Sequence, residues 1–479
     1  MHAPPSDPAP ASRAANVDAV PLGQALRSAL RGTEFDYTRG SLARAVLLLA
    51  VPMVVEMGME SLFAIADAWF VKDLGDDALA SVALTEAMAT IVYAIAIGLS
   101  MAATAMVARR VGADDLPGAR RAAGQAVRVG VIVGLVLGVP CVIFARELLG
   151  LMGASARVQD TGAGYAGFVL GGNLVILLLF LNNAIFRGAG DASIAMKALV
   201  VSNCANLVLD PCLIFGIGPF PELGVTGAGL ATLIGRGLGV AYQFKALARK
   251  ERRVHLDVDA LRHHGADVRE LLHTSYGGVG QFLLATASWM VLVAIVAPSG
   301  DAALAGHQVG VRILMFTILP AFGLSNATAT LVGQNLGAGH VPRALRSVWI
   351  VGLWNMGFMG AVAIVFFAFA PELVALFTEH ASDKATMQRV GVDCLRIISL
   401  GYVFYAWGMV TMQAFNGAGR TMVPTWLNLI CFWIVEVPLA WALAGPFGLG
   451  PAGVYWSVAF SESLLAVLSI IVFRKLRWE

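Results

Sequence analysis

The sequence predicts an all-α integral membrane protein, and three observations point to this fold class. Of the 479 residues, 58% are hydrophobic and only 13% are charged, whereas a soluble domain has roughly 25% charged residues. Long apolar stretches recur, each sufficient to cross a bilayer core that takes about 20 helical residues. One sequence pattern also occurs twice, which indicates two homologous halves.

The internal repeat is clearest in residues 98–121, GLSMAATAMVARRVGADDLPGARR, which return as residues 323–346, GLSNATATLVGQNLGAGHVPRALR. At this offset of 225, ten of the 24 positions are identical. The same offset relates residues 75–80 to residues 300–305. In a membrane protein, such a repeat is typical of a transporter with a substrate site between its halves.

The apolar stretches predict about twelve membrane-spanning helices, in chain order. We expect them at 43–71, 78–108, 122–145, 161–186, 192–217, 224–247, 268–297, 303–333, 345–370, 386–415, 422–444 and 452–473.

Charge sets the expected orientation of these helices. Of the 33 Lys and Arg residues, five lie in or beside the odd-to-even loops and three lie within segments, which leaves 25 at the N-terminus, the even-to-odd loops and the C-terminus. Positively charged loops stay on the cytoplasmic side. Both termini are therefore expected in the cytoplasm, and the basic runs need no nucleic-acid partner to explain them.

The sequence divides into a tail, two lobes and a linker. Residues 1–39 are rich in Pro and Ala and lack the apolar run of a signal peptide, so we expect a disordered cytoplasmic tail. Residues 40–247 form the N-lobe and residues 267–475 the C-lobe. The polar stretch 248–266 is the expected cytoplasmic linker.

Three acids in the first segment are unusual for a membrane helix. Glu56, Glu60 and Asp67 lie at spacings of 4 and 7 residues, which places them on one helical stripe. Buried acids are costly in a bilayer and usually face a cavity or the bundle interior. Pro52 precedes them and is the expected flex point of this helix.

The fifth segment carries a second polar face. Asn203, Asn206 and Asp210 follow at i, i+3 and i+7, and Pro211 comes directly after. A carboxylate near carboxamides and a second carboxylate suits a shared proton. The same oxygens suit Na⁺, a hard cation.

Plainer interpretations of these acids stay open. Asp210 could end a helix before Pro211, and Glu60 could face solvent. Glu56 aligns with Gln281 at the offset of 225, so its polar group could serve helix packing. Asp67 could have a structural role only. Glu436 aligns with Asp210 at an offset of 226 but lacks the two asparagines, which makes it a lone acid of the C-lobe.

Taken together, the motifs resemble those of multidrug and toxic compound extrusion (MATE) transporters over roughly residues 43–473. The resemblance rests on the spacing from Pro52 to Asp67, the repeated GLS motifs, FRGAGD at 186–191 with FNGAG at 415–419, and the NxxNxxxDP run. It implies two six-helix lobes related by a pseudo-twofold axis, and efflux of bulky, often cationic compounds coupled to inward H⁺ or Na⁺.

The bacterial DinF-type branch is most similar, and it implies a cation site in the N-lobe. Asp67, Tyr165, Asn206, Asp210 and Thr232 match its site residues, with Asp67 as the coupling carboxylate, Asp210 as its partner, and a possible Na⁺ at Asp67, Asn206 and Asp210. The NorM-type branch uses a glutamate in the seventh helix, and the seventh segment here has no acid.

The drug site is harder to read from sequence. Methionine and aromatic side chains adapt to varied ligands, and candidates for an adaptable cavity are Met59, Phe63, Gln281, Phe282 and Trp289.

The expected partners are lipophilic cations and membrane lipids, with a monomer in the bacterial inner membrane. No phosphate-binding or hydrolase motif indicates an enzyme, and no cofactor beyond the coupling ion is expected. A flippase for lipid-linked precursors is the alternative function, although the acidic intramembrane charges argue against it.

Overall fold

A computed structural model describes residues 14–71, 74–378 and 383–478 of the chain. In residues 62–69 and 71 this description covers the helix but not the side chains.

The first half of the chain is helical after a short two-stranded start. A parallel pair of strands, β1 (Ala15–Asn16) and β2 (Phe35–Asp36), brackets helix α1 (Leu22–Arg31). The next helices, all long except α5, are α2 (Leu42–Val71), α3 (Asp76–Gly112), α4 (Leu116–Ile143), α5 (Ala145–Leu151), α6 (Ala156–Gly171), α7 (Asn173–Ala189), α8 (Ala192–Phe215) and α9 (Val225–Leu247).

The second half repeats this order. It consists of α10 (Gly265–Val296), η1 (Ala297–Ser299), α11 (Asp301–Gly337), α12 (Val341–Thr378), α13 (Lys384–Leu400), α14 (Tyr402–Gly417), α15 (Met422–Asn428), the π-helical η2 (Leu429–Glu436), α16 (Val437–Ala444) and α17 (Pro451–Lys475). We call α2–α9 the N-lobe and α10–α17 the C-lobe. The linker spans 248–264, two residues shorter than expected because α10 already begins at Gly265.

The expected membrane spans correspond to these helices. Within the described residues, ten helices are long and apolar enough to cross a bilayer, and the pair α13–α14, bent by 60° at its break, makes an eleventh if it is one span. The remaining expected span is α9, which carries Arg236 and Lys245. The all-α, two-lobed fold is therefore confirmed.

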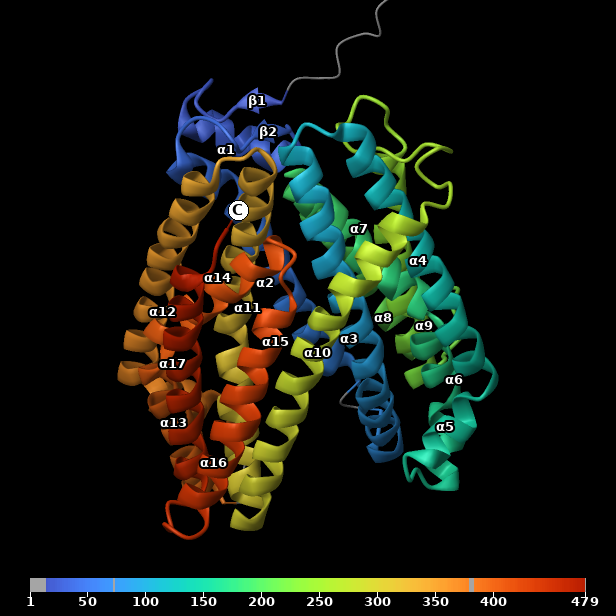
Figure 1. Cartoon of the computed structure of the whole chain (residues 1–479). Coiled ribbons are helices and arrows are strands. Elements are labelled where there is room, and N and C mark those ends of the chain that lie inside the picture. Colours follow the sequence, from blue (N-terminus) through green and yellow to red (C-terminus); the bar gives the residue numbers. More distant parts are fainter. Residues whose placement is uncertain (1–13, 72–73, 379–382, 479) are drawn as a thin grey trace, which may run out of the picture.

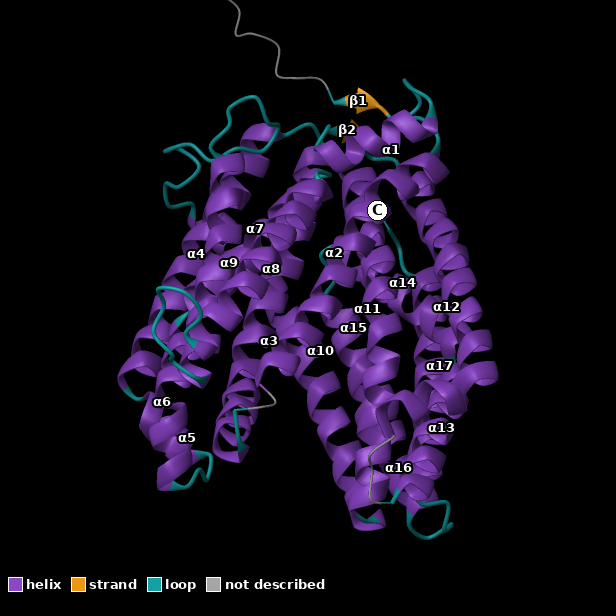
Figure 2. Cartoon of the chain, turned by 180° about the vertical axis from the view of Figure 1, so that it is seen from behind, coloured by secondary structure: helices purple, strands orange, loops and turns teal. Residues whose placement is uncertain are grey.

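The two lobes meet at one end of the bundle and diverge toward the other. Figures 1 and 2 show this end at the top, where α1, the two strands and the C-terminus lie. We call it the terminal end. The linker is bound to α4 near this end. Gln125 of α4 donates from Nε2 to the carbonyl oxygens of Ala260 (3.1 Å) and Arg262 (2.6 Å) of the linker.

Glycines allow the lobes to touch at the terminal end. A Cβ atom on Gly112 of α3 would collide with the carbonyl oxygen of Gln334 on α11, and a Cβ on Gly337 of α11 would collide with the carbonyl oxygen of Arg109 on α3. Both residues of the second contact lie 225 positions from those of the first. The two contacts are therefore equivalent under the internal repeat, and the backbones of α3 and α11 are in direct contact.

Residues 14–39 are ordered, so the expectation of a disordered tail is wrong for this part; residues 1–13 lie outside the described residues. Val17, Ala25, Phe35 and Tyr37 are at most 2% exposed. On the N-lobe side, Lys197 Nζ of α8 donates to the carbonyl oxygen of Arg31 at 2.7 Å. Apolar burial of this kind offsets the entropy cost of ordering a segment.

The same segment also contacts the C-lobe. Arg343 of α12 donates to the carbonyl oxygens of Gly40 (2.8 Å), Arg39 (3.0 Å) and Tyr37 (3.3 Å). Residues 14–40 therefore connect α8 of one lobe with α12 of the other across the terminal end (Figure 1).

Candidate functional site

The polar residues of the fifth expected span meet α9 in the interior of the N-lobe. Asn206 Nδ2 lies 3.2 Å from Asp210 Oδ1 and 3.3 Å from Thr232 Oγ1 of α9. Asn206 and Asp210 are each 1% exposed. Their i, i+4 spacing stacks them on one face of α8. The structure thus brings three of the predicted coupling residues together.

Small residues make this cluster possible. A Cβ atom on Gly235 of α9 would lie 2.8 Å from the carbonyl oxygen of Ser202 and 3.1 Å from Asn206 Cβ, so a larger residue would push α9 away from α8. Tyr165 of α6 is 6% exposed and packs against Gly229 of α9, three residues before Thr232. Tyr165 therefore lies beside the same face of α9 as the cluster.

Asn203, also predicted as a coupling residue, makes its hydrogen bond outside the cluster. Its Nδ2 donates to the backbone oxygen of Met59 at 2.9 Å and so connects α8 to α2. The side chains of Asp67 and Phe63 lie outside the described residues. The expected meeting of Asp67 with Asp210 therefore stays a prediction.

Glu56 belongs to a separate polar network between helices. It is 1% exposed, and its Oε1 accepts from Asn183 Nδ2 of α7 (3.2 Å) and lies 3.9 Å from Arg187 Nη1. Gln243 of α9 donates to Asn183 Oδ1 at 2.6 Å. Glu56 therefore has partners of its own on α7.

The C-lobe contains the counterpart of this network. Gln281, which aligns with Glu56, exchanges hydrogen bonds with Asn416 of α14 (3.1 and 3.2 Å). Asn416 occupies the place in FNGAG that Arg187 occupies in FRGAG. An acid and a base in one lobe are thus replaced by two amides in the other. The packing interpretation of Glu56 fits these contacts, and Gln281 is 6% exposed.

Sequence reasoning missed Asn183, Arg187 and Gln243. The echo of FRGAG in FNGAG was the available signal, because it marks the position in each lobe that contacts the aligned pair Glu56 and Gln281. The contact itself joins residues more than 120 positions apart, which no local pattern reveals.

The other candidates are dispersed. Pro52 is buried within α2, and the helix continues through it. Glu60 is partly buried on the same helix. Glu436 is 3% exposed and lies in the C-lobe, at the end of the π-helical turn η2. The structure thus separates Glu436 from the cluster on α8.

Two of the three aromatic cavity candidates, Phe282 and Trp289, lie on α10, and the third, Phe63, lies on α2 with its side chain outside the described residues. Phe282 and Trp289 are partly exposed, and the ring of Trp289 lies 6.5 Å from that of His307 on α11. They remain candidates for a substrate surface of the C-lobe.

A buried carboxylate, a carboxamide and a hydroxyl can hold a proton or a small hard cation. Among the described residues, no group of three or more His, Cys, Asp or Glu side chains could hold a metal ion. Among the described side chains of this cluster, the oxygens beside Asp210 are those of the Asn206 amide and the Thr232 hydroxyl.

Comparison with known proteins assigns the family. The MatE family model matches residues 52–212 and 279–442, one stretch in each half. The chain belongs to the MatE family of membrane transporters. The paired match follows the internal repeat, and the cluster on α8 falls at the end of the first stretch.

Individual relatives agree with this assignment. "Probable multidrug resistance protein NorM" of Thermotoga maritima is 26% identical over 91% of this chain and 93% of its own. "FAD transporter" of Shewanella oneidensis is 26% identical over 89% and 93%. A solved structure, "Outward-facing conformation of a multidrug resistance MATE family transporter of the MOP superfamily", matches with a TM-score of 0.85 at 26% identity, covering 91% of this chain and 96% of that one.

Proposed function

We propose that this protein is a secondary active multidrug efflux transporter, which exports lipophilic, often cationic compounds against inward H⁺ or Na⁺ by alternating access. The observation that carries the proposal is the buried Asn206–Asp210–Thr232 cluster in the N-lobe. Family membership and the multidrug names of several relatives support the substrate class.

In this mechanism the cluster on α8 and α9 takes up the coupling ion together with Asp67 of α2, with Tyr165 beside it. Entry of a cation changes the charge state of the cluster, and α2 repacks on α8 with Pro52 as its flex point. A coupling ion shifts the equilibrium between the inward-open and outward-open states only by the difference in its affinity for them. Asn203, which connects α8 to the backbone of α2, is placed to transmit the change.

The distribution of charge supports an orientation. Arg109, Arg110, Arg120, Arg121 and the basic linker lie at the terminal end, and positively charged loops remain cytoplasmic. With both termini inside, the lobes are closed toward the cytoplasm and diverge outward. A monomer in the bacterial inner membrane, surrounded by lipid, is the proposed form.

Export of an anionic nucleotide is the second candidate, because one relative of nearly full length is named FAD transporter. The buried acid of the cluster favours cations instead. A precursor flippase is the third candidate, and the acidic charge inside the N-lobe argues against it.

The test is counterflow in proteoliposomes with a fluorescent lipophilic cation, under an imposed H⁺ gradient or an imposed Na⁺ gradient. Asp67→Asn and Asp210→Asn are compared with wild type, and Glu222→Gln, an exposed acid between α8 and α9, is the matched control. We expect one gradient to drive transport in wild type and control, and neither gradient to do so in the two Asn variants.

Each alternative has its own outcome. Gradient-driven transport that survives in both Asn variants would place coupling elsewhere, with Glu436 tested next. Transport of FAD but of no cation would replace the multidrug proposal with nucleotide export. Gradient-independent movement of a lipid-linked precursor would favour the flippase.

A further inference from the structure

A pocket of about 560 Å³ lies at the terminal end, where the two lobes touch. Arg109 and Arg110 of α3 line it from the N-lobe. Gly337 of α11, Arg420 and Trp478 line it from the C-lobe. Because both lobes form its walls, the pocket exists only while α3 and α11 are in contact.

Arg109 has no salt bridge within the part of the chain that the structure describes, and its side chain is exposed. A Cβ atom on Gly419 would lie 3.6 Å from Arg109 Nη1. The guanidinium of Arg109 therefore lies beside the Gly419–Arg420 turn of the opposite lobe. Gly419 has φ +74°, a conformation that glycine adopts readily.

Arg420 is held in place by the C-terminal residues. Its Nη2 donates to the carbonyl oxygen of Arg477 at 2.8 Å, and its guanidinium lies 5.7 Å from the ring centroid of Trp478. Neither contact neutralises its charge, and no carboxylate within the described ranges forms an ion pair with it. Two guanidinium groups from opposite lobes thus converge on one pocket.

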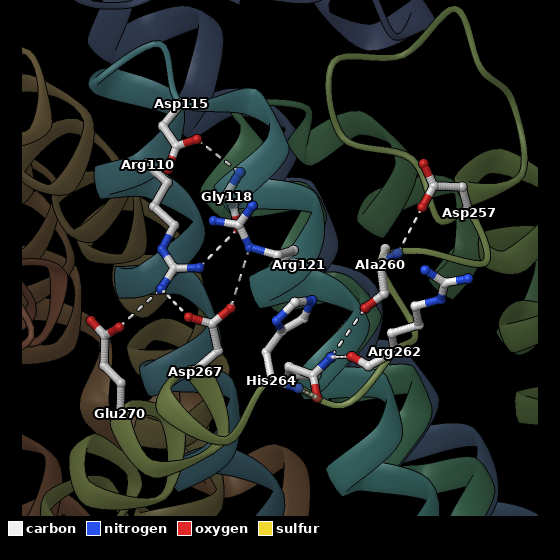
Figure 3. Close-up of polar contacts among 11 residues, drawn as sticks. Arg110, Asp115, Gly118, Arg121, Asp257, Ala260, Arg262, His264, Asp267 and Glu270 are labelled. Carbon is white, nitrogen blue, oxygen red and sulfur yellow. Dashed lines mark hydrogen bonds and ion pairs between the residues drawn. The ribbon is translucent and has the colours of Figure 1, made fainter.

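Two acids also line the pocket. Asp115 accepts from the backbone nitrogen of Gly118 at 2.8 Å and caps α4, and it keeps its negative charge. Glu270 pairs with Arg110 at 3.0 Å, and Arg110 also binds Asp267 at 2.7 Å (Figure 3). Three guanidinium groups and two carboxylates line the pocket, so its formal net charge is +1.

We propose that this pocket binds a phosphate group, with Arg109 and Arg420 as its ligands. Guanidinium groups match phosphate oxygens in charge and geometry, and charge-assisted hydrogen bonds to them are the strong class. The phosphate comes from an anionic phospholipid headgroup or from free phosphate in solution. Basic pockets between membrane helices are known to take lipid headgroups.

Occupation would have a conformational consequence. One ligand residue comes from each lobe, so the phosphate binds only the arrangement in which the lobes touch at the terminal end. Binding therefore stabilises that arrangement by mass action. This inference concerns binding and stands independently of which compound the protein transports.

The first experiment is thermal unfolding of the full-length protein in neutral detergent, titrated with inorganic phosphate and compared with chloride at matched ionic strength. The second compares nanodiscs of phosphatidylcholine alone with nanodiscs that contain phosphatidylglycerol. Variants are Arg109→Gln, Arg420→Gln and both together. Arg346→Gln, an exposed arginine near the start of α12, is the matched control.

We expect phosphate or phosphatidylglycerol to raise the unfolding midpoint of wild type and of Arg346→Gln by about 2–4 °C. The double variant should lose the rise, and each single variant should lose most of it. A rise with inorganic phosphate identifies free phosphate as sufficient, and a rise only with phosphatidylglycerol identifies the lipid headgroup. Equal behaviour of the double variant and the control, or no specific rise with either inorganic phosphate or phosphatidylglycerol, would overturn the proposal.

Discussion

At the scale of single residues, the pair Glu56–Arg187 connects α2 to α7 in the N-lobe, and the pair Gln281–Asn416 connects α10 to α14 in the C-lobe. Replacing Glu56 by Ala leaves the buried Nδ2 of Asn183 without its acceptor and removes the carboxylate that lies 3.9 Å from the guanidinium of Arg187. A lost hydrogen bond to a charged group costs about 2 kcal/mol. We therefore expect Glu56→Ala to lower the free energy of unfolding by about that amount, measured by chemical denaturation in detergent.

The internal repeat supplies the control for this prediction. Glu56→Gln combined with Arg187→Asn copies the amide pair of the C-lobe, so the double variant should recover most of the stability lost in Glu56→Ala. If the double variant were as unstable as Glu56→Ala, the two pairs would not be equivalent.

Glu34 predicts a dependence of stability on pH. Its pKa is raised above the ordinary value of 4.5, first by burial and then by the nearby carboxylate of Asp191. The native state therefore binds more protons than the unfolded state just above pH 4.5, so stability falls as pH rises through the native pKa.

The variant Glu34→Gln removes this titration and keeps an acceptor for the backbone nitrogen of Arg253, which lies 3.3 Å from Glu34. We expect Glu34→Gln to be more stable than wild type at pH 7, with the difference shrinking as pH falls toward 4.5. Unfolding midpoints measured across this range test it, and a difference that is constant with pH would contradict it.

At the scale of elements, the contact of α3 with α11 depends on two glycines. Alanine at Gly112 or Gly337 would place a Cβ atom against a backbone oxygen of the opposite lobe, so neither helix can yield by moving a side chain alone. We expect Gly112→Ala and Gly337→Ala to separate the lobes at the terminal end. Distances between spin labels on α3 and α11 should lengthen.

The control is Gly237→Ala in α9, where a Cβ atom would meet nothing within 4 Å. Alanine is the better helix former by about 1 kcal/mol, so this variant should be as stable as wild type or more so, with unchanged distances. If the distances were unchanged in Gly112→Ala as well, the contact of α3 with α11 would not determine how closely the lobes approach.

The sequence predicted the helices well and the contacts between them poorly, for a physical reason. Apolar length is a local property, so every expected span from 43–71 to 452–473 has a counterpart among the helices. The i, i+4 pair of Asn206 and Asp210 was equally local. The role of Arg187, however, depends on its contact with Glu56, which lies 131 positions earlier in the chain and on another helix.

At the scale of the whole molecule, the order of residues 14–40 was also not predictable from local sequence. Their sequence has no apolar run, and their order comes from contacts with distant parts of the chain: Lys197 in the N-lobe, and Arg343 in the C-lobe. A segment that is too polar to fold alone becomes ordered because both lobes supply partners at the terminal end.

This arrangement predicts that the N-terminal segment helps to hold the lobes together. Deletion of residues 1–39 removes the buried side chains of Val17, Phe35 and Tyr37, each of which contributes roughly 1.5–3 kcal/mol when fully buried. We expect a lower unfolding midpoint and a broader distribution of distances between spin labels at the terminal ends of α8 and α12. A truncation of residues 1–13, which keeps every contact named here, is the matched control. If the longer deletion left the distance distribution as narrow as the shorter one, the segment would rest on the lobes without constraining them.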